Sequence, residues 1–367
     1  MFKGNFDISL DFLKVKSPPL IGVDISTSSV KMVELSLMDK GDQTYRIERY
    51  AIESMPADAM LDGGIVDLEA VSECLQRGWK RMGTRQRNVA LALPATDVIT
   101  KRIIVPAGQR EDDLAFQVEN EANQYIPFPL DEIDLDFQVV KPVPDNPEEV
   151  EILIAASRKE KVEDRVAAAL SAGLKAIIMD VEPYAAQAAF ELTLDQLPEG
   201  GKDQVIALVD IGATVMKINV LHNGESVYTR DQPFGGNQLT QEIRNQFNLS
   251  LEESEIAKRS GNLPENYKRD VLQPFCETLA VEVTRAIQFF YTSTQYTEVN
   301  YIFIAGGCAV IPGLDEIIVS RTQVSTLIVN PFLSMELSSR IIPRQLNLDA
   351  PSLLIACGLA LRSFDPS

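Results

Sequence analysis

The chain has 367 residues, of which 45% are hydrophobic and 24% are charged, as in an ordinary globular protein of two or three domains. Acidic residues outnumber basic ones by 53 to 34, and the net charge of −19 argues against nucleic acid or an anionic membrane as a partner of the surface as a whole. One histidine and four scattered cysteines exclude the usual zinc sites and predict buried thiols in a reducing compartment.

The first half of the chain alternates between predicted strands and helices. No apolar run approaches the roughly 20 residues of a membrane span. The arm 1–19 does not have the form of a signal peptide, so we expect a cytoplasmic protein. The same arm carries apolar residues at helical spacing and is expected to pack as a helix on its own domain. Strands are predicted over 20–24, 30–37, 45–52, 88–94, 100–105 and 151–157, and helices over 67–82, 111–125 and 159–172.

The second half repeats this alternation. Residues 205–221 predict a strand, a tight turn and another strand, and 301–307 predict a buried strand that ends in two glycines. The proline-rich stretch 141–149 in the first half is expected to be a loop. Strands that alternate with helices throughout indicate an α/β protein with mixed sheets. Helical patterns cover 237–259, 271–297 and 352–363.

The two halves share a short motif. Val23-Asp24-Ile25 is matched by Val209-Asp210-Ile211, 186 residues later, and each copy ends an apolar strand. A small, polar turn follows each copy, and a lysine lies seven residues beyond each aspartate, at Lys31 and Lys217. The repeat predicts two similar lobes on either side of a cleft.

Turns of this kind suit an anion, because small residues let successive backbone N–H groups converge. Hydroxyl groups add donors in the first turn, and Lys31 supplies a positive charge for a phosphate. Asp24 and Asp210, at the two strand ends, are expected to hold the water shell of a magnesium ion. We therefore predict that the two turns grip the phosphates of one nucleotide. Two ordinary hairpins with small turns are the alternative that this pattern leaves open.

A third element follows the predicted strand at 301–307. Gly306 and Gly307 allow the backbone to approach a ligand closely, and a helix start near Pro312 adds N–H donors for an anion. Such a pair of glycines more often marks a tight turn. Its position late in the second half favours a ligand site.

In this order along the chain, five segments resemble the phosphate-1, connect-1, phosphate-2, adenosine and connect-2 segments of the actin-like ATPase superfamily: GVDISTSSVK, MDVEPYAAQAAF, VDIGATVMK, IAGGCAVIPGL and LLIACGLAL. Within this superfamily the chain is most similar to the PilM family of type IV pilus assembly proteins, which is itself similar to the division protein FtsA. The features of that family are LIGVDI, IPFPLDEIDLDF, MDVEPYAA and PFGGNQLTQEI.

The resemblance implies an actin-like ATPase fold, in which two lobes of mixed sheet flanked by helices surround a nucleotide cleft. It also implies an inserted domain 1C like that of FtsA. After the arm 1–19, domain 1A would take 20–95, 178–204 and 335–367, domain 1C 96–177, domain 2A 205–235 and 298–334, and domain 2B 236–297.

The resemblance further assigns residues to ATP and Mg²⁺. Glu182 takes the position where relatives place a residue near the attacking water or the magnesium ion. Position 26 departs from the family pattern, which usually has glycine there. No strong general base is evident, so ATP hydrolysis is expected to be slow or absent. The expected ATP contacts are Asp24, Ser26, Thr27, Ser28, Ser29, Lys31, Asp210, Gly212, Ala213, Thr214, Gly236, Asn237, Glu255, Lys258, Gly306, Gly307 and Cys308.

Two charged stretches are candidate interaction surfaces. Residues 77–87 hold five basic residues and no acidic one, and 110–136 hold nine acidic residues and one basic one. Either stretch can be a solvated face, and the second can also receive a basic peptide. The resemblance implies that peptide to be the N-terminal cytoplasmic tail of the inner-membrane protein PilN, bound in a groove between domains 1A and 1C. It also implies contact with pilus motor ATPases, with membrane association only through partners.

Three functions remain open from the sequence. The first is an ATP-binding scaffold of type IV pilus biogenesis and twitching motility. The second is an ATP-dependent small-molecule kinase, for which the sequence offers no aspartate base beyond those assigned to metal. The third is a filament-forming cytoskeletal protein that associates with itself. The expected lack of an FtsA-like membrane-targeting helix weakens the third.

Overall fold

Two units make up the part of the chain that this computed structural model describes, residues 19–39, 44–143 and 146–365. Unit 1 comprises residues up to 37, 48–186 and 355 onward, and unit 2 comprises 38–47 and 187–354. The helix predicted within the arm 1–19 lies outside the described residues. No helix in the described part of the chain is both long and apolar enough to cross a bilayer.

The largest sheet belongs mainly to unit 1. Its strands are β1 (Ile21–Ile25), β2 (Ser29–Asp39), β3 (Thr44–Ser54), β6 (Asn88–Leu93), β10 (Lys175–Val181) and β16 (Glu336–Leu337). They run in the order β10-β6-β1-β2-β3-β16. β1 pairs antiparallel with β2 and parallel with β6, which pairs parallel with β10. A small hairpin, β4 (Met60–Leu61) and β5 (Gly64–Ile65), follows β3.

Four helices accompany this sheet: α1 (Leu68–Met82), α3 (Lys159–Ser171), α4 (Glu182–Glu191) and α10 (Leu354–Leu361). α1 confirms the predicted helix at 67–82. The carboxylate of Asp67 accepts the Ala70 N–H at its start, and Gly83 ends it with φ 62°. α10 is buried along its whole length and packs against the α4 backbone. Apolar side chains of α1, α3 and the sheet form one core.

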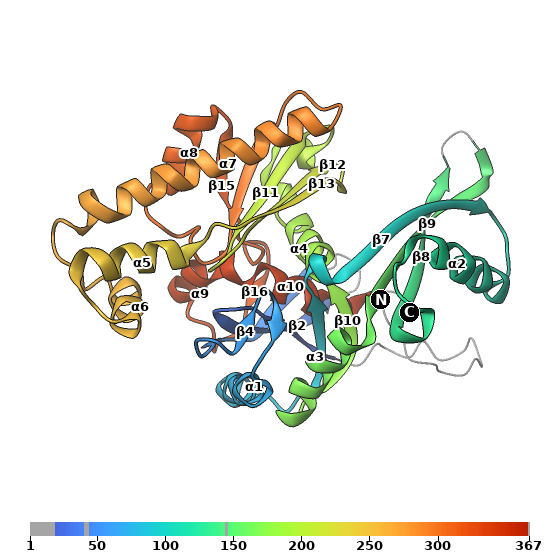
Figure 1. Cartoon of the computed structure of the whole chain (residues 1–367), viewed down its shortest axis with the longest axis horizontal. Helices are drawn as coiled ribbons and strands as arrows, with labels where there is room; N and C mark the ends of the chain where they lie inside the picture. The colour runs from blue at the N-terminus through green and yellow to red at the C-terminus, as the bar shows by residue number, and fades with distance from the viewer. Residues whose placement is uncertain (1–18, 40–43, 144–145, 366–367) are drawn as a thin grey trace. The chain divides into compact units, whose positions relative to one another are not determined.

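An inserted subdomain lies within unit 1, between β6 and α3. Its elements are β7 (Val98–Pro106), α2 (Glu111–Tyr125), β8 (Ile133–Val143) and β9 (Asn146–Arg158). The strands form an antiparallel sheet in the order β7-β9-β8, with α2 packed alongside it (Figure 1). Leu114, Val118 and Ala122 of α2 face this sheet.

The prediction of a loop at 141–149 is wrong. The two ends of the β8–β9 hairpin occupy most of this stretch, and Pro142 is paired with Val150. β8 is an edge strand, and edge strands tolerate proline because only one of their two sides is paired with another strand.

Unit 2 is built on a five-stranded sheet. Its strands are β11 (Val205–Ile211), β12 (Met216–His222), β13 (Glu225–Gln232), β14 (Tyr301–Ala305) and β15 (Ser325–Ile328), in the order β13-β12-β11-β14-β15. Its helices are α5 (Gly236–Phe247), α6 (Leu251–Ser260), α7 (Gln273–Ser293), α8 (Leu314–Thr322) and α9 (Pro343–Asp349). α7 runs across one face of the sheet (Figure 1), where Leu279, Val283 and Phe290 are fully buried.

The helical pattern predicted over 237–259 is two helices. Asn248 ends α5 with φ 54°, and Ser250 begins α6 with a capping box that includes Glu253. This break turns α6 back beside α5, so that the two helices contact each other (Figure 1).

Candidate functional site

The first predicted turn joins β1 to β2 in unit 1. Asp24 is 3% exposed, and the antiparallel register places Lys31 directly opposite it. The Lys31 Nζ lies 2.7 Å from Asp24 Oδ2 and donates to Ser26 Oγ at 3.2 Å. The structure therefore brings Asp24, Ser26 and Lys31 together.

Ser26 closes this turn. Its hydroxyl donates to the Ser29 carbonyl at 2.9 Å, and its backbone N–H donates to the same oxygen at 3.0 Å. Ser29 is buried at the start of β2, whereas Thr27 and Ser28 are half-buried at the tip of the turn. A serine in place of the family's glycine thus stabilises the turn from within.

Two further charged groups of unit 1 lie near this turn. Glu182 is the first residue of α4 and is 6% exposed. Arg165 of α3 is 3% exposed and donates to the Gly63 carbonyl at 2.9 Å and to the Ile25 carbonyl at 3.4 Å. Burial lowers the pKa of Arg165, and the charges of Glu182 and Asp24 oppose that shift. The arginine therefore lies within the electric field of both carboxylates.

The second predicted turn joins β11 to β12 in unit 2. Asp210 is opposite Lys217 in the register, which repeats the pairing of the first turn. The start of α5 rests on this turn: Gly236 N–H donates to the Gly212 carbonyl at 3.0 Å, and Asn237 N–H donates to Ala213 at 2.8 Å. Thr214 is exposed at the tip of the turn.

The third predicted element meets the second turn. Gly306 follows β14 with φ 84°, and a Cβ there would lie 2.5 Å from Asp210 Oδ1. Gly307 is exposed, whereas Cys308 is buried, with its Sγ 3.0 Å from where a Gly236 Cβ would be. Burial raises the pKa of Cys308 to about 11, so the group is a neutral thiol at pH 7. Only glycine fits at position 306, because the backbone passes directly over the Asp210 carboxylate.

A polar cluster joins α6 to α5. The Lys258 Nζ lies 2.7 Å from Glu255 Oε1 and 2.5 Å from Thr240 Oγ1, and the Thr240 hydroxyl also bonds to Glu255. Lys258 also reaches the Gly236 carbonyl at 3.4 Å. Burial acts to raise the pKa of Glu255, but hydrogen bonds from Lys258 and Thr240 outweigh burial, and the pKa lies below its usual value.

The predicted residues of unit 2 thus converge, although they come from four segments: 210–214, 236–237, 255–258 and 306–308. Thr240 was not predicted, although it lies one helical turn after Gly236 and so shares its face. Arg165 was not predicted either. The sequence feature that could have identified it is a charged residue on the apolar face of α3, which also includes Val162, Ala168 and Ala169. In the described part of the chain no three His, Cys, Asp or Glu side chains are placed to ligate a metal directly.

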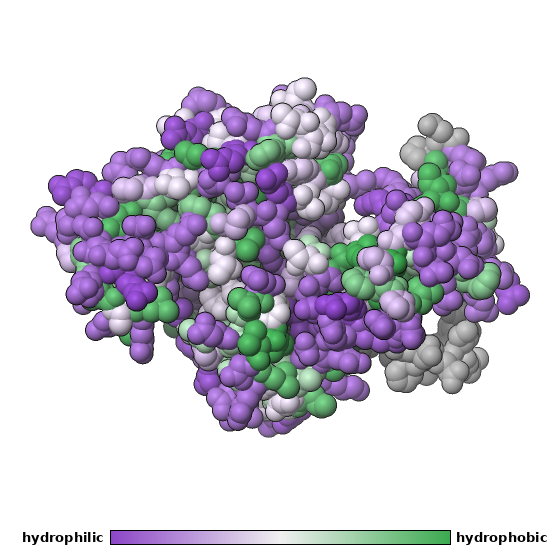
Figure 2. Space-filling view, viewed as in Figure 1, coloured by the Kyte–Doolittle hydropathy of each residue, from purple (hydrophilic) through white to green (hydrophobic). Residues whose placement is uncertain are grey.

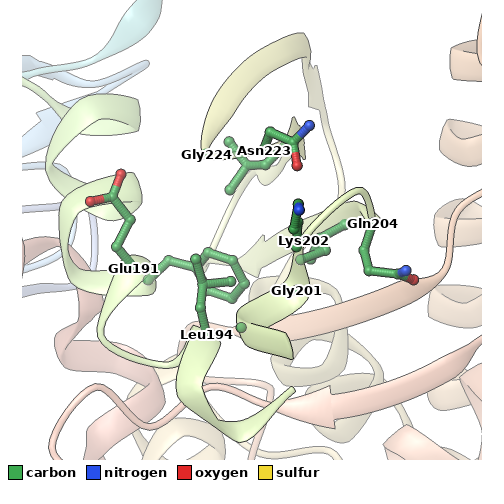
Figure 3. Close-up of a pocket in the computed structure, with 11 residues that line it drawn as sticks. Glu191, Leu194, Gly201, Lys202, Gln204, Asn223 and Gly224 are labelled. Atoms are coloured by element: carbon green, nitrogen blue, oxygen red, sulfur yellow. The ribbon is translucent and has the colours of Figure 1, made fainter. Parts of the chain in front are cut away.

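A pocket of about 390 Å³ in unit 2 is separate from these turns (Figure 3). None of the predicted site residues lines it. Its walls are apolar at Phe190, Leu194, Ile206 and Leu221 and polar at Glu191, Lys202, Gln204 and Asn223. The Asn223 Oδ1 accepts the Asp203 N–H at 2.8 Å and so ties together two of the turns that frame the pocket.

The structure shares its fold with several solved proteins. A chain of a PilM–PilN type IV pilus biogenesis complex is 28% identical with a TM-score of 0.77, over 96% of this chain and 100% of that one. The ethanolamine utilization protein EutJ from Carboxydothermus hydrogenoformans is 18% identical, with a TM-score of 0.56 over 95% and 91% of the two chains. ADP-bound MreB5 of Spiroplasma citri is 15% identical, with a TM-score of 0.50 over 95% and 97%. These likenesses identify the actin-like ATPase fold that the motifs predicted.

Sequence comparisons agree with the fold. The cell division protein FtsA of Bacillus subtilis (strain 168) is 22% identical over 258 residues, which are 65% of this chain and 57% of FtsA. The match therefore spans little more than half the length of that curated relative. A family model described as type IV pilus assembly protein PilM matches residues 22–364. Because that match extends over nearly the whole chain and includes both turns and the glycine pair, the chain belongs to the PilM family of type IV pilus assembly proteins.

Proposed function

We propose that this protein is an ATP-binding scaffold of type IV pilus assembly that also binds the N-terminal cytoplasmic peptide of PilN. Membership of the PilM family supports the pilus role, and the similar chain in the PilM–PilN complex supports the partner. The observation that carries ATP binding is the meeting of Gly306, the 212–214 turn and the start of α5 around Asp210.

Two turns bind the phosphates in this proposal, one after β1 and the other after β11. Backbone N–H groups of the two turns bind phosphate oxygens, and Lys31 adds a positive charge. Gly306 and Gly307 border the nucleoside, and Glu255 and Lys258 bind its ribose and adenine. Asp24 and Asp210 would hold magnesium through water. Bound magnesium supplies positive charge that offsets the charge of the phosphates.

Slow hydrolysis is part of the proposal. Glu182 is the carboxylate that we assign to the attacking water. It is buried at the first position of α4, and carboxylates are in general weak bases. The function of ATP in this protein would then depend mainly on its binding and not on its hydrolysis.

The peptide surface that we propose lies on the inserted subdomain of unit 1, along α2. The first turn of α2 carries Glu111, Asp112 and Asp113, and the surface over α2 is mostly hydrophilic in Figure 2. Phe116 is 68% exposed and Tyr125 is 48% exposed on the same helix. Exposed aromatic rings beside carboxylates suit a peptide with apolar and basic residues.

Calorimetric titration with ATP and magnesium tests the nucleotide site. The parent should bind one ATP per chain. Asp24→Asn and Asp210→Asn should each weaken ATP binding at least tenfold, because both carboxylates are assigned to the same magnesium ion. Asp203→Asn, beside the pocket of Figure 3, is the matched control and should bind like the parent. Unchanged affinity in both site variants would exclude the proposed site.

Titration with a synthetic peptide of the PilN cytoplasmic N-terminus tests the partner surface. Reversing the charges of Glu111, Asp112 and Asp113 to lysine should weaken binding at least tenfold, and added salt should weaken the parent's binding too. Glu316→Lys in the first turn of α8 is the control for a charge reversal elsewhere on the surface. Equal affinity in the triple variant would place the peptide elsewhere.

A further inference from the structure

Arg165 is a buried cation whose hydrogen bonds join three distant segments of unit 1. Its guanidinium donates to the carbonyl of Ile25, the last residue of β1 before the phosphate turn. It also donates to the carbonyl of Gly63, in the turn between β4 and β5. Because burying a charge is unfavourable unless it is paired and hydrogen-bonded, this arginine holds its partners in fixed positions. The hydrogen bond from Arg165 thus holds the Ile25 carbonyl in place against α3.

The start of α3 is joined to the inserted subdomain. α3 begins at Lys159, directly after β9 ends at Arg158, so no loop separates the strand from the helix. The Lys159 Nζ donates to the Asp131 carbonyl at 2.7 Å, in the short 3₁₀ turn that precedes β8. From Lys159 to Arg165 the helix rises about 9 Å. A rigid helix therefore connects the 130–132 turn to the phosphate turn.

We propose that Arg165 is the positioning residue through which α3 couples the phosphate turn of unit 1 to the inserted subdomain. The proposal rests on the proposed function, in which that turn binds ATP. A ligand that orders residues 26–28 also reduces the motion of the Ile25 carbonyl, which directly precedes them. Because Arg165 is hydrogen-bonded to that carbonyl, the motion of α3 is reduced as well. Lys159 then passes this restraint to the 130–132 turn. Two directed N–H donors are needed at position 165, which a lysine ammonium on a flexible chain does not reproduce.

Hydrogen–deuterium exchange on the full chain, with and without saturating ATP and magnesium, tests this coupling. In the parent, ATP should slow exchange at 25–30 and also at 126–135. In Arg165→Lys, ATP should still slow exchange at 25–30, but the effect at 126–135 should fall at least threefold. Lys161→Met, one turn earlier on α3 and half-exposed, should behave like the parent. A merely structural role of Arg165 would change exchange with and without ATP alike.

Lys159→Met is the second variant, because it cuts the same connection and leaves Arg165 in place. It should also lose the ATP effect at 126–135. The proposal would be overturned if ATP slowed exchange at 126–135 in both variants as much as in the parent. It would also be overturned if the parent bound ATP with no change in exchange at 126–135. A parent that binds no ATP in a separate titration would contradict the proposed function itself, and the coupling with it.

Discussion

Gly306 shows how one backbone conformation determines the position of a site carboxylate. Its φ of 84° disfavours a side chain, and a Cβ would lie 2.4 Å from the Ile211 carbonyl oxygen. Gly306→Ala should therefore lower the free energy of unfolding by about 2 kcal/mol or more, measured by urea denaturation. Gly307→Ala is the control, because a Cβ there meets no atom within 4 Å, and its effect should stay within about 0.5 kcal/mol. Equal losses in both variants would refute this account of the site.

Glu255 makes the stability of unit 2 depend on pH. Its pKa is lowered in the folded protein from a usual value of 4.5, because hydrogen bonds from Lys258 and Thr240 outweigh burial. A lowered carboxyl pKa stabilises the folded state above the unfolded value, and this stabilisation is lost as the pH falls through the folded value. The parent should exceed Glu255→Gln in stability at pH 7, and the difference should shrink below about pH 4.5. A difference that stays constant down to pH 3 would contradict the lowered pKa.

Elements that are specified by nearby residues were predicted well from the sequence. Helices α1 and α2 agree with their predicted ranges, because apolar spacing identifies the buried face and Asp67 and Gly83 mark the ends of α1. β8 was missed, although apolar and acidic residues alternate at its start as in a half-buried strand, and its pairing with β9 depends on residues farther along the chain. The break at Asn248 had a local signal, the serine and glutamate of the α6 capping box.

In the candidate site too, features that depend on residues close in sequence were predicted, and features that depend on distant residues were not. The two turns followed from the repeated aspartate and lysine, which are close in sequence. Arg165 bonds to carbonyls 140 and 102 residues away, so no local pattern specifies its partners. The approach of α6 to α5 was implied by the resemblance alone, since it depends on the break between the two helices.

The packing of α10 on α4 is a contact between backbones. A Cβ on Gly358 would lie 1.7 Å from the Ala185 carbonyl oxygen, so Gly358→Ala must push the helices apart. We expect a loss of about 3 kcal/mol in stability, or failure to fold. Gly78→Ala in α1 is the matched control, because its Cβ would meet only flexible side chains, those of Met32 at 3.2 Å and Glu53 at 3.4 Å. Alanine's higher helix propensity, worth about 1 kcal/mol, should offset that crowding. Similar melting temperatures for the two variants would contradict the assigned contact.

At the scale of the whole molecule, each unit has its own hydrophobic core, so unfolding need not occur in one step. Trp79, the single tryptophan, lies on α1 and reports on unit 1, whereas far-UV circular dichroism reports on both units. The two signals should therefore give different midpoints in urea.

ATP with magnesium should raise both of these midpoints, because the proposed ATP contacts include residues of both units. At a hundredfold excess over Kd the stabilisation is about 2.7 kcal/mol. Asp210→Asn should remove the shift from both signals, although Trp79 lies in the other unit. A shift of the circular dichroism midpoint alone would mean that ATP binds only to unit 2. The turn of unit 1 would then be an ordinary hairpin, as its sequence alone allowed.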